Sequence, residues 1–369
     1  MIKFLVYFYA GGNRFRYKAL GRVFLMRIIA IDEIKTGMKL ARAIYREEDG
    51  GILLRPNIEL KENYIERIKE LNYSHVYVLD PEDSGESVIY EQISEETRFR
   101  ARGILKKTFK QMDTDEIINA GNMKSIINEI IDQVCSNIDV IYNFIDIRSR
   151  ENYIYAHSVN VCIISMMIGM EMGLNRIQLS EMGIGAFLHD MGMVCNRSKS
   201  SKWQVVELDT DEDFKKHPRS GYELIKKKME LSFLSAHVVL QHHEREDGSG
   251  YPRGLAGKRI HRFAKIVAVA DSFDTLAYQK HQKLVAPYRA ISEIKACAGK
   301  KYDQHVVDSF VKIMAPYPVG CILSLSNGET VIVEYVSRYE CRVKVIAGNE
   351  TGKVYNLYQF PKISVEKVL

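Results

Sequence analysis

The stretch QHHEREDGSGYPRGL, from Gln241 to Leu255, combines residues that packing in a protein core does not explain. An adjacent pair of histidines in it, His242–His243, is followed closely by the string Gly248-Ser249-Gly250-Tyr251-Pro252. A His-Asp pair stands further upstream, and single His and Asp residues complete an ordered series along the chain. The series consists of His157, His189, Asp190, His217, His242, His243 and Asp271.

Imidazole and carboxylate groups together suit iron, manganese or zinc, and the absence of nearby thiolates argues against a closed structural zinc site. Any single histidine, taken alone, is better explained by one structural hydrogen bond than by metal binding. The joint occurrence of a His-His pair, a His-Asp pair and a carboxylate directly after the apolar run Ile266 to Ala270 instead predicts a metal site.

From about Ile126 to Pro318, these motifs resemble the HD-GYP family of metal-dependent phosphodiesterases that open cyclic di-GMP. The resemblance implies a mainly α fold, with a helical bundle as its core. It also implies two divalent metal ions, with iron or manganese expected. One ion would be held by His157, His189, Asp190 and Asp271. The other would be held by His217, His242 and His243, with the Asp190 carboxylate bridging the pair.

Some family members bind a third ion through a glutamate four residues before the first histidine, where this chain has Tyr153. A binuclear site is therefore expected. Such a pair lowers the pKa of a bridging water and supplies hydroxide as the nucleophile, with Asp190 and His189 at the catalytic centre. The family's product from cyclic di-GMP is linear pGpG, which some members hydrolyse further to GMP.

The substrate-binding candidates follow the His-His pair or come later in the chain. Gly248 and Gly250 allow sharp backbone turns near a ligand, and tight packing of a surface loop is the alternative. The full set of candidates is Arg245, Gly250, Tyr251, Pro252 and Lys280.

The chain also departs from the family pattern. Met193 stands where a lysine close to the substrate phosphate is usual, Lys280-His281-Gln282 replaces an arginine followed by Pro-Tyr, and Cys195-Asn196 replaces Ile-Pro. Loss of an ammonium beside a phosphate costs roughly a few kcal/mol in the transition state. A cyclic di-GMP receptor that keeps its metals is thus the main alternative to an enzyme. A phosphohydrolase for another nucleotide, such as a hybrid cyclic dinucleotide, is the second.

Composition describes an ordinary globular protein: 369 residues, 46% apolar and 27% charged. The length predicts two or three domains. The net charge of +5 is mild and its basic residues are scattered, so no nucleic-acid polymer is expected as a partner. The 6 cysteines show no CxxC and no pairing pattern, which indicates buried thiols in a reducing cytoplasm.

Five segments are expected. Residues 1–25 are interpreted as a non-native or disordered extension from an over-extended translation start, with a peripheral membrane contact as the alternative, and no stable membrane insertion is expected. A small α+β module over 26–84 follows, for packing or dimerisation, then a helical linker over 85–122. The metal-dependent phosphohydrolase domain covers 123–316, and a small β appendage covers 317–369.

Periodicity locates the elements within these segments. An apolar stripe over Met123 to Ile147 predicts the first helix of the bundle, or alternatively part of a homodimer interface. Asp49-Gly50-Gly51 predicts a turn between two strands of the first module. Further helices are expected over 60–71, 95–112, 158–172, 177–188, 231–241 and 266–275, with another starting at His217, and strands over 40–45, 52–54, 76–79, 319–325, 330–336, 341–346 and 354–358.

Overall fold

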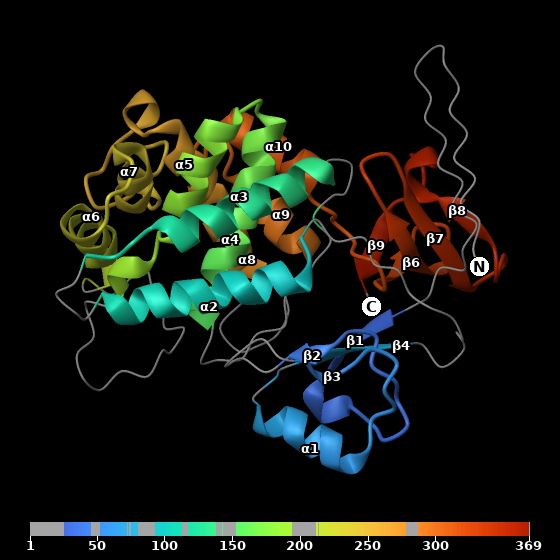
Figure 1. Cartoon of the computed structure of the whole chain (residues 1–369). Helices are drawn as coiled ribbons and strands as arrows, with labels where there is room; N and C mark the ends of the chain where they lie inside the picture. Colours follow the sequence, from blue (N-terminus) through green and yellow to red (C-terminus); the bar gives the residue numbers. More distant parts are fainter. Residues whose placement is uncertain are drawn as a thin grey trace, which may run out of the picture.

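The computed structural model of the chain describes residues 26–45, 52–79 except 72 and 74, 93–112, 117–137, 142, 153–193, 212, 214–277 and 287–368. Figure 1 shows a helical bundle, a small mixed module that precedes it in sequence, and a β domain that follows it. This is the mainly α architecture that the resemblance predicts. The N-terminal extension lies outside the described residues.

The N-terminal module pairs its first strand with its last. Strand β1 (Met26–Ala30) runs antiparallel to β4 (His75–Leu79), and β2 (Ile44–Tyr45) pairs with β3 (Ile52–Leu54). The 3-10 turn η1 (Ile31–Glu33) follows β1, and helix α1 (Glu62–Glu70) precedes β4. The module has its own apolar core, formed mainly by Leu40, Leu60, Ile65, Ile68, Val76 and Val78. The expected turn at 49–51 falls outside the described residues.

Two helices lead into the bundle. Helix α2 (Glu95–Gln111) begins at the N-cap Ser94, whose side chain accepts a hydrogen bond from the Thr97 backbone. Helix α3 (Gly121–Ser136) is shorter than the expected helix ending at Ile147. It ends at the C-cap Asn137, and further along the chain the Tyr142 backbone N–H donates to the Ile313 carbonyl (2.6 Å).

The bundle is built around α4 (Tyr153–Glu171), whose residues from Ala156 to Gly169 are all buried. It is long and apolar enough to cross a membrane, but 83% of its most apolar 18-residue segment is buried inside the protein, as in the core helix of a bundle. The remaining helices of the bundle are α5 (Arg176–Phe187), α6 (His217–Lys228), α7 (Phe233–Gln241), α8 (Arg262–Ala277), α9 (Pro287–Ala296) and α10 (Gln304–Ile313).

Three features of the bundle differ from expectation. Helix α4 begins at Tyr153, so that His157 lies inside the helix and not at its start. Helices α9 and α10 were not expected. Asp303 is a favoured N-cap residue that could have indicated α10, and its side chain accepts hydrogen bonds from two backbone N–H groups there. Short 3-10 turns complete the connections: η2 (Met191–Met193), η4 (Phe214–Lys216) and η5 (Gly257–Arg259).

The C-terminal domain is a five-stranded antiparallel sheet in the order β8-β7-β6-β5-β9. Its strands are β5 (Ile322–Leu325), β6 (Thr330–Val336), β7 (Cys341–Ala347), β8 (Val354–Asn356) and β9 (Val365–Val368). The expected last strand, 354–358, is too long, because the chain enters the 3-10 turn η6 (Leu357–Gln359). Strand β9 was not expected; it forms one edge of the sheet, antiparallel to β5.

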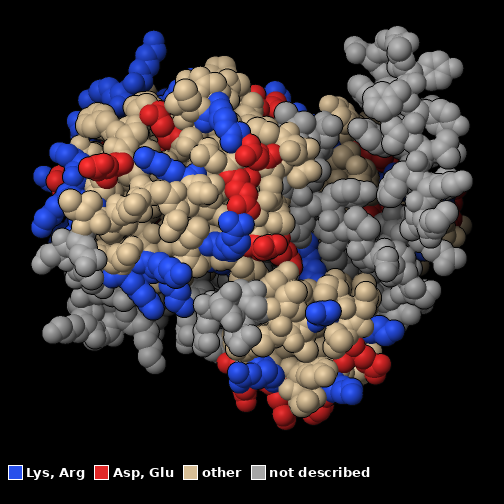
Figure 2. Space-filling model, in the orientation of Figure 1, with Lys and Arg blue, Asp and Glu red and all other residues tan. Residues whose placement is uncertain are grey.

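The cysteines depart in part from the expectation of buried thiols. Cys162 and Cys341 are buried, but Cys135 is exposed, and every cysteine among the described residues is free. Acidic and basic side chains are interspersed over the helices on the face shown in Figure 2, as the scattered charge in the sequence predicts.

Candidate metal centre

The ends and faces of five helices bring the seven candidate ligands together. His157 lies on α4 and Asp271 on α8, His189–Asp190 follow the end of α5, His217 begins α6, and His242–His243 follow α7. All seven are buried, with exposed fractions of at most 8%. Buried polar groups in such number need partners that offset the loss of water.

The ligand atoms form two adjacent groups. Asp190, His217, His242 and His243 form one, and His157, His189 and Asp271 form the other; within each group, the potential ligand atoms lie within 4.8 Å of one another. Asp190 touches both groups through different oxygens. Its Oδ1 lies 3.4 Å from Nε2 of His217, and its Oδ2 lies 3.4 Å from Nε2 of His189. This is the geometry that a bridging carboxylate needs.

Four imidazoles are held by hydrogen bonds that turn Nε2 toward the centre. In three of them, Nδ1 donates to the backbone carbonyl three residues earlier, at 2.7–2.8 Å: His189 to Ala186, His217 to Phe214 and His242 to Val239. A carbonyl can only accept, so Nδ1 carries the proton and Nε2 is left as the metal-binding atom. The fourth, His157, contacts the Asp274 carboxylate through Nδ1 (2.7 Å).

His243 is oriented differently. Its ring stacks on Tyr251, with 4.6 Å between centroids and a 29° interplanar angle. Among the described residues, its buried Nδ1 has no hydrogen-bond partner, and the nearest carboxylate oxygen, Asp271 Oδ2, is 3.9 Å away. A buried nitrogen without a partner is costly. A metal ion in the first group would satisfy it, so the residues present fit a bound cation.

Electrostatics prepares the carboxylates as ligands. Burial alone would raise the pKa of Asp190, but His189, His217 and His157 hold it well below its ordinary range. Asp271 is likewise lowered: burial is opposed by its hydrogen bond to His157 and by the nearby His243, so its pKa also stays low. Both side chains are therefore ionised at neutral pH, the form in which carboxylates bind metal ions.

The histidines of the two groups differ. Burial, reinforced by His189 and His217, lowers the pKa of His242 to about 3. Burial also lowers the pKa of His217 and His243, so all three imidazoles are neutral. For His157, burial acts to lower the pKa, but Tyr153 and hydrogen bonds to Asp271 and Asp274 raise it well above its ordinary value. A cation here would replace the proton that His157 shares with Asp271, whose oxygen lies 3.2 Å from Nε2.

The loop after α7 is clamped against the centre. The buried Glu244 carboxylate accepts from the backbone N–H groups of Arg253 (2.9 Å) and Leu255 (2.8 Å). Gly250 packs directly on this turn, because a Cβ there would lie 2.4 Å from the His243 carbonyl oxygen. The clamp places Tyr251 beside the candidate ligand His243, and Pro252 follows it in the chain.

The other substrate candidates are placed unequally. The Arg245 guanidinium carbon lies 5.3 Å from the centre of the Tyr302 ring, and its charge contributes to lowering the pKa of His243, after burial and other neighbours. Within the described part of the chain, Nη1 of Arg245 is buried without a hydrogen-bond partner. Lys280, like the departures at 195–196 and 280–282, lies outside the described residues.

Two other departures are visible. Met193 is partly buried and packs against the apolar core of the bundle. Tyr153 stacks on His157, with 5.6 Å between ring centroids and an 8° interplanar angle. An aromatic ring therefore covers His157 at the position from which a third-ion glutamate would act.

Two buried acids of the site were missed in the sequence. Asp274 holds His157, and Glu244 fixes the loop. The spacing of Asp271 and Asp274 offered a clue, because residues three apart share a helix face. Glu244 carried no clue beyond its place directly after the His-His pair.

A family model described as an HD domain matches residues 140–306. A cyclic di-GMP phosphodiesterase of Pseudomonas aeruginosa is 28% identical over 243 residues, which cover 63% of this chain and 57% of that protein. Another, of Thermotoga maritima, is 34% identical over 167 residues, covering 44% of this chain and 45% of its own length.

A solved structure of Bd1817, an HDG"Y"P protein from Bdellovibrio bacteriovorus, has a TM-score of 0.48 and 16% identity, over 77% of this chain and 98% of that one. The chain spans about half the length of the two curated relatives named above, 57% of the first and 45% of the second. Residues 140–306 are therefore similar to HD domains, and the similarity to the HD-GYP family that the sequence predicts is confirmed.

Proposed function

We propose that this chain is a metal-dependent phosphodiesterase that hydrolyses cyclic di-GMP to linear pGpG, with GMP as a further product. The observation that carries the proposal is Asp190, whose two oxygens face two separate groups of buried ligands. Relatives named as cyclic di-GMP phosphodiesterases support the substrate class. Three further relatives are named as 3'3'-cGAMP-specific phosphodiesterases, so a hybrid dinucleotide is the competing substrate.

Two divalent ions, iron or manganese, are the proposed cofactors. His157, His189, Asp190 and Asp271 would hold one of them, and His217, His242 and His243 the other, with Asp190 shared. Bound in this way, the pair would supply a water of lowered pKa and neutralise charge on the phosphate. The chain's own contribution is to keep the carboxylates ionised and each Nε2 aimed inward, so that little reorganisation is needed at the moment of reaction.

Arg245, Gly250, Tyr251, Pro252 and Lys280 are the proposed substrate-binding residues. Arg245 is the best supported, because its buried Nη1 has no partner among the described residues and suits a phosphate oxygen. The clamped loop would hold Tyr251 as a fixed wall beside the centre. Met193 offers no charge to the phosphate, which predicts slow turnover or, in the receptor alternative, none.

The proposed organisation around the site follows the domain boundaries of the sequence. Residues 123–316 would form the phosphohydrolase domain, with the modules at 26–84 and 317–369 as regulatory or packing units. A cytoplasmic location follows from a cytoplasmic second messenger as substrate. A homodimer remains a proposal, for which the oligomeric state in solution is the test.

The deciding experiment is anaerobic purification with iron or manganese, followed by chromatography of cyclic di-GMP incubated with the wild type and with Asp190→Ala. Linear dinucleotide or GMP produced by the wild type alone would support the phosphodiesterase. If the substrate stays intact while the protein holds two metals and binds cyclic di-GMP, the chain is a receptor and not an enzyme. If a hybrid cyclic dinucleotide is hydrolysed in preference in a competition assay, the proposed reaction stands and the proposed substrate is wrong.

A further inference from the structure

A buried chain of hydrogen bonds connects His157 to a helix that precedes the HD domain. Nδ1 of His157 contacts Oδ2 of Asp274 on α8 (2.7 Å), and Nδ2 of Asn160 on α4 donates to Oδ1 of the same carboxylate (3.2 Å). Nη1 of Arg98 on α2 donates to Oδ1 of Asn160 (2.8 Å). Arg98 and Asn160 are 2% and 1% exposed, so solvent does not compete for these bonds.

The chemistry of Arg98 gives the chain of bonds a direction. A guanidinium can only donate, so the atom of Asn160 that faces it must be the oxygen. The amide nitrogen of Asn160 is then turned toward Asp274, whose second oxygen remains for His157. Without Arg98, the amide could turn over and present its oxygen to the carboxylate, which repels it. The carboxylate that holds His157 would lose its fixed position.

We infer that Arg98 is a positioning residue for the metal centre, acting on His157 through Asn160 and Asp274. The assignment rests on the proposed function, in which His157 is a metal ligand. It adds a residue from α2, outside the matched region of 140–306, to the machinery of the site. The network also acts on one ion only, since it reaches His157 and none of the ligands of the other group.

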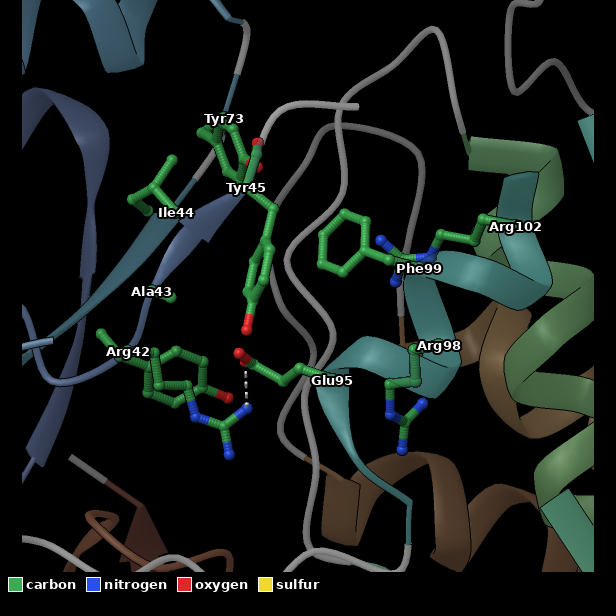
Figure 3. Close-up of a pocket in the computed structure, with 10 residues that line it drawn as sticks. Arg42, Ala43, Ile44, Tyr45, Tyr73, Glu95, Arg98, Phe99 and Arg102 are labelled. Atoms are coloured by element: carbon green, nitrogen blue, oxygen red, sulfur yellow. Dashed lines mark hydrogen bonds and ion pairs between the residues drawn. The ribbon is translucent and has the colours of Figure 1, made fainter. Parts of the chain in front are cut away.

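Arg98 also stands where the N-terminal module meets the bundle. It lines a pocket together with Arg42 and Tyr77 of the module and Phe99 of α2 (Figure 3). In the same turn of α2, Glu95 pairs with Arg42 (3.5 Å). The module therefore pairs with α2 one helical turn before the residue that orients the amide of Asn160.

The test uses Arg98→Met, which removes the donors and keeps most of the stem, and Arg98→Lys, which keeps one charge and a donor. Arg100→Met is the matched control, because Arg100 lies on the same helix, is about half exposed and pairs with Glu129 on the surface. Manganese binding is measured by anaerobic calorimetry without substrate, with the melting temperature alongside.

Arg98→Met is expected to lower the affinity for one of the two manganese ions by about 10–100-fold, the usual effect of removing a residue that supports a metal ligand. The affinity for the other ion should not change. Arg98→Lys should recover part of the loss, and Arg100→Met should match the wild type. If Arg98→Met binds both ions with wild-type affinity, or loses affinity equally at both sites, the assignment is overturned. If Arg98→Met does not fold, Asn160→Asp serves instead, since it keeps an acceptor for Arg98 and removes the donor to Asp274.

The outcomes separate this inference from the proposed function. If Arg98→Met selectively loses one ion but the wild type hydrolyses no cyclic dinucleotide, Arg98 is a positioning residue and the proposed enzymatic function is wrong. If the wild type hydrolyses its substrate and Arg98→Met binds metal as the wild type does, the enzymatic function stands and the positioning role is wrong.

Discussion

Gly192 allows two backbone segments to meet at the metal centre, and Gly192→Ala should separate them. Gly192 lies in η2, two residues after Asp190, and packs on the first turn of α6. A Cβ at this position would lie 1.9 Å from the His217 carbonyl oxygen and 2.6 Å from the Gly221 nitrogen. Both are backbone atoms, so no side chain can turn aside to relieve the overlap.

The required displacement is large on the scale of a metal site. The 1.9 Å approach is about 1.5 Å short of the 3.4 Å at which ordinary contact begins. Metal–ligand distances tolerate only about 0.2 Å. His217 now lies 3.4 Å from Asp190 Oδ1 and 3.1 Å from Nε2 of His242. We therefore expect loss of the ion that His217 would hold, and a fall in turnover of at least ~100-fold, since misplacement by about 1 Å costs that much.

Metal content after desalting, measured by mass spectrometry, and cyclic di-GMP turnover together test this prediction. Unfolding in urea should show a cost of about 1–3 kcal/mol from overpacking. Gly103→Ala is the control: Gly103 is exposed in α2, has nothing within 4 Å of its virtual Cβ, and should gain stability of about 0.5–1 kcal/mol. A Gly192→Ala protein with two ions per chain and wild-type turnover would refute the reasoning.

Three further predictions concern the loop and the phosphate side. Gly250→Ala would place a Cβ 2.4 Å from the His243 carbonyl oxygen, so hydrolysis should fall by at least ~100-fold and the free energy of unfolding in urea by about 1–3 kcal/mol; unchanged kinetics would contradict it. Glu244→Gln leaves one acceptor oxygen for two backbone N–H groups of the loop, so the free energy of unfolding should fall by about 1–3 kcal/mol. A urea midpoint equal to that of the wild type would contradict this prediction. Met193→Lys should raise kcat without changing metal content, and a lower kcat would show that the methionine is needed for packing.

Much of the bundle was predictable, because helix periodicity and capping are local. The bounds of α5 and α7 lie within one or two residues of expectation, and in the C-terminal domain β6 is matched in full. Predictions failed where a distant partner decides. Helix α3 ends at Ser136, and Tyr142 beyond it bonds to the distant Ile313, while β9 pairs with β5, which precedes it by about 40 residues.

By itself, the sequence determined which side chains could bind metal and the order in which helix ends deliver them, since a His-Asp pair, a His-His pair and their flanking helices are contiguous strings. The tertiary structure decided how those side chains divide. That Asp190 faces both ligand groups, that Asp274 holds His157, and that Arg98 turns the amide of Asn160 depend on atoms from helices distant in the chain. Hydrogen bonds and ligand geometry are set at the scale of an ångström, which only the packing of α2, α4, α5, α6 and α8 against one another fixes.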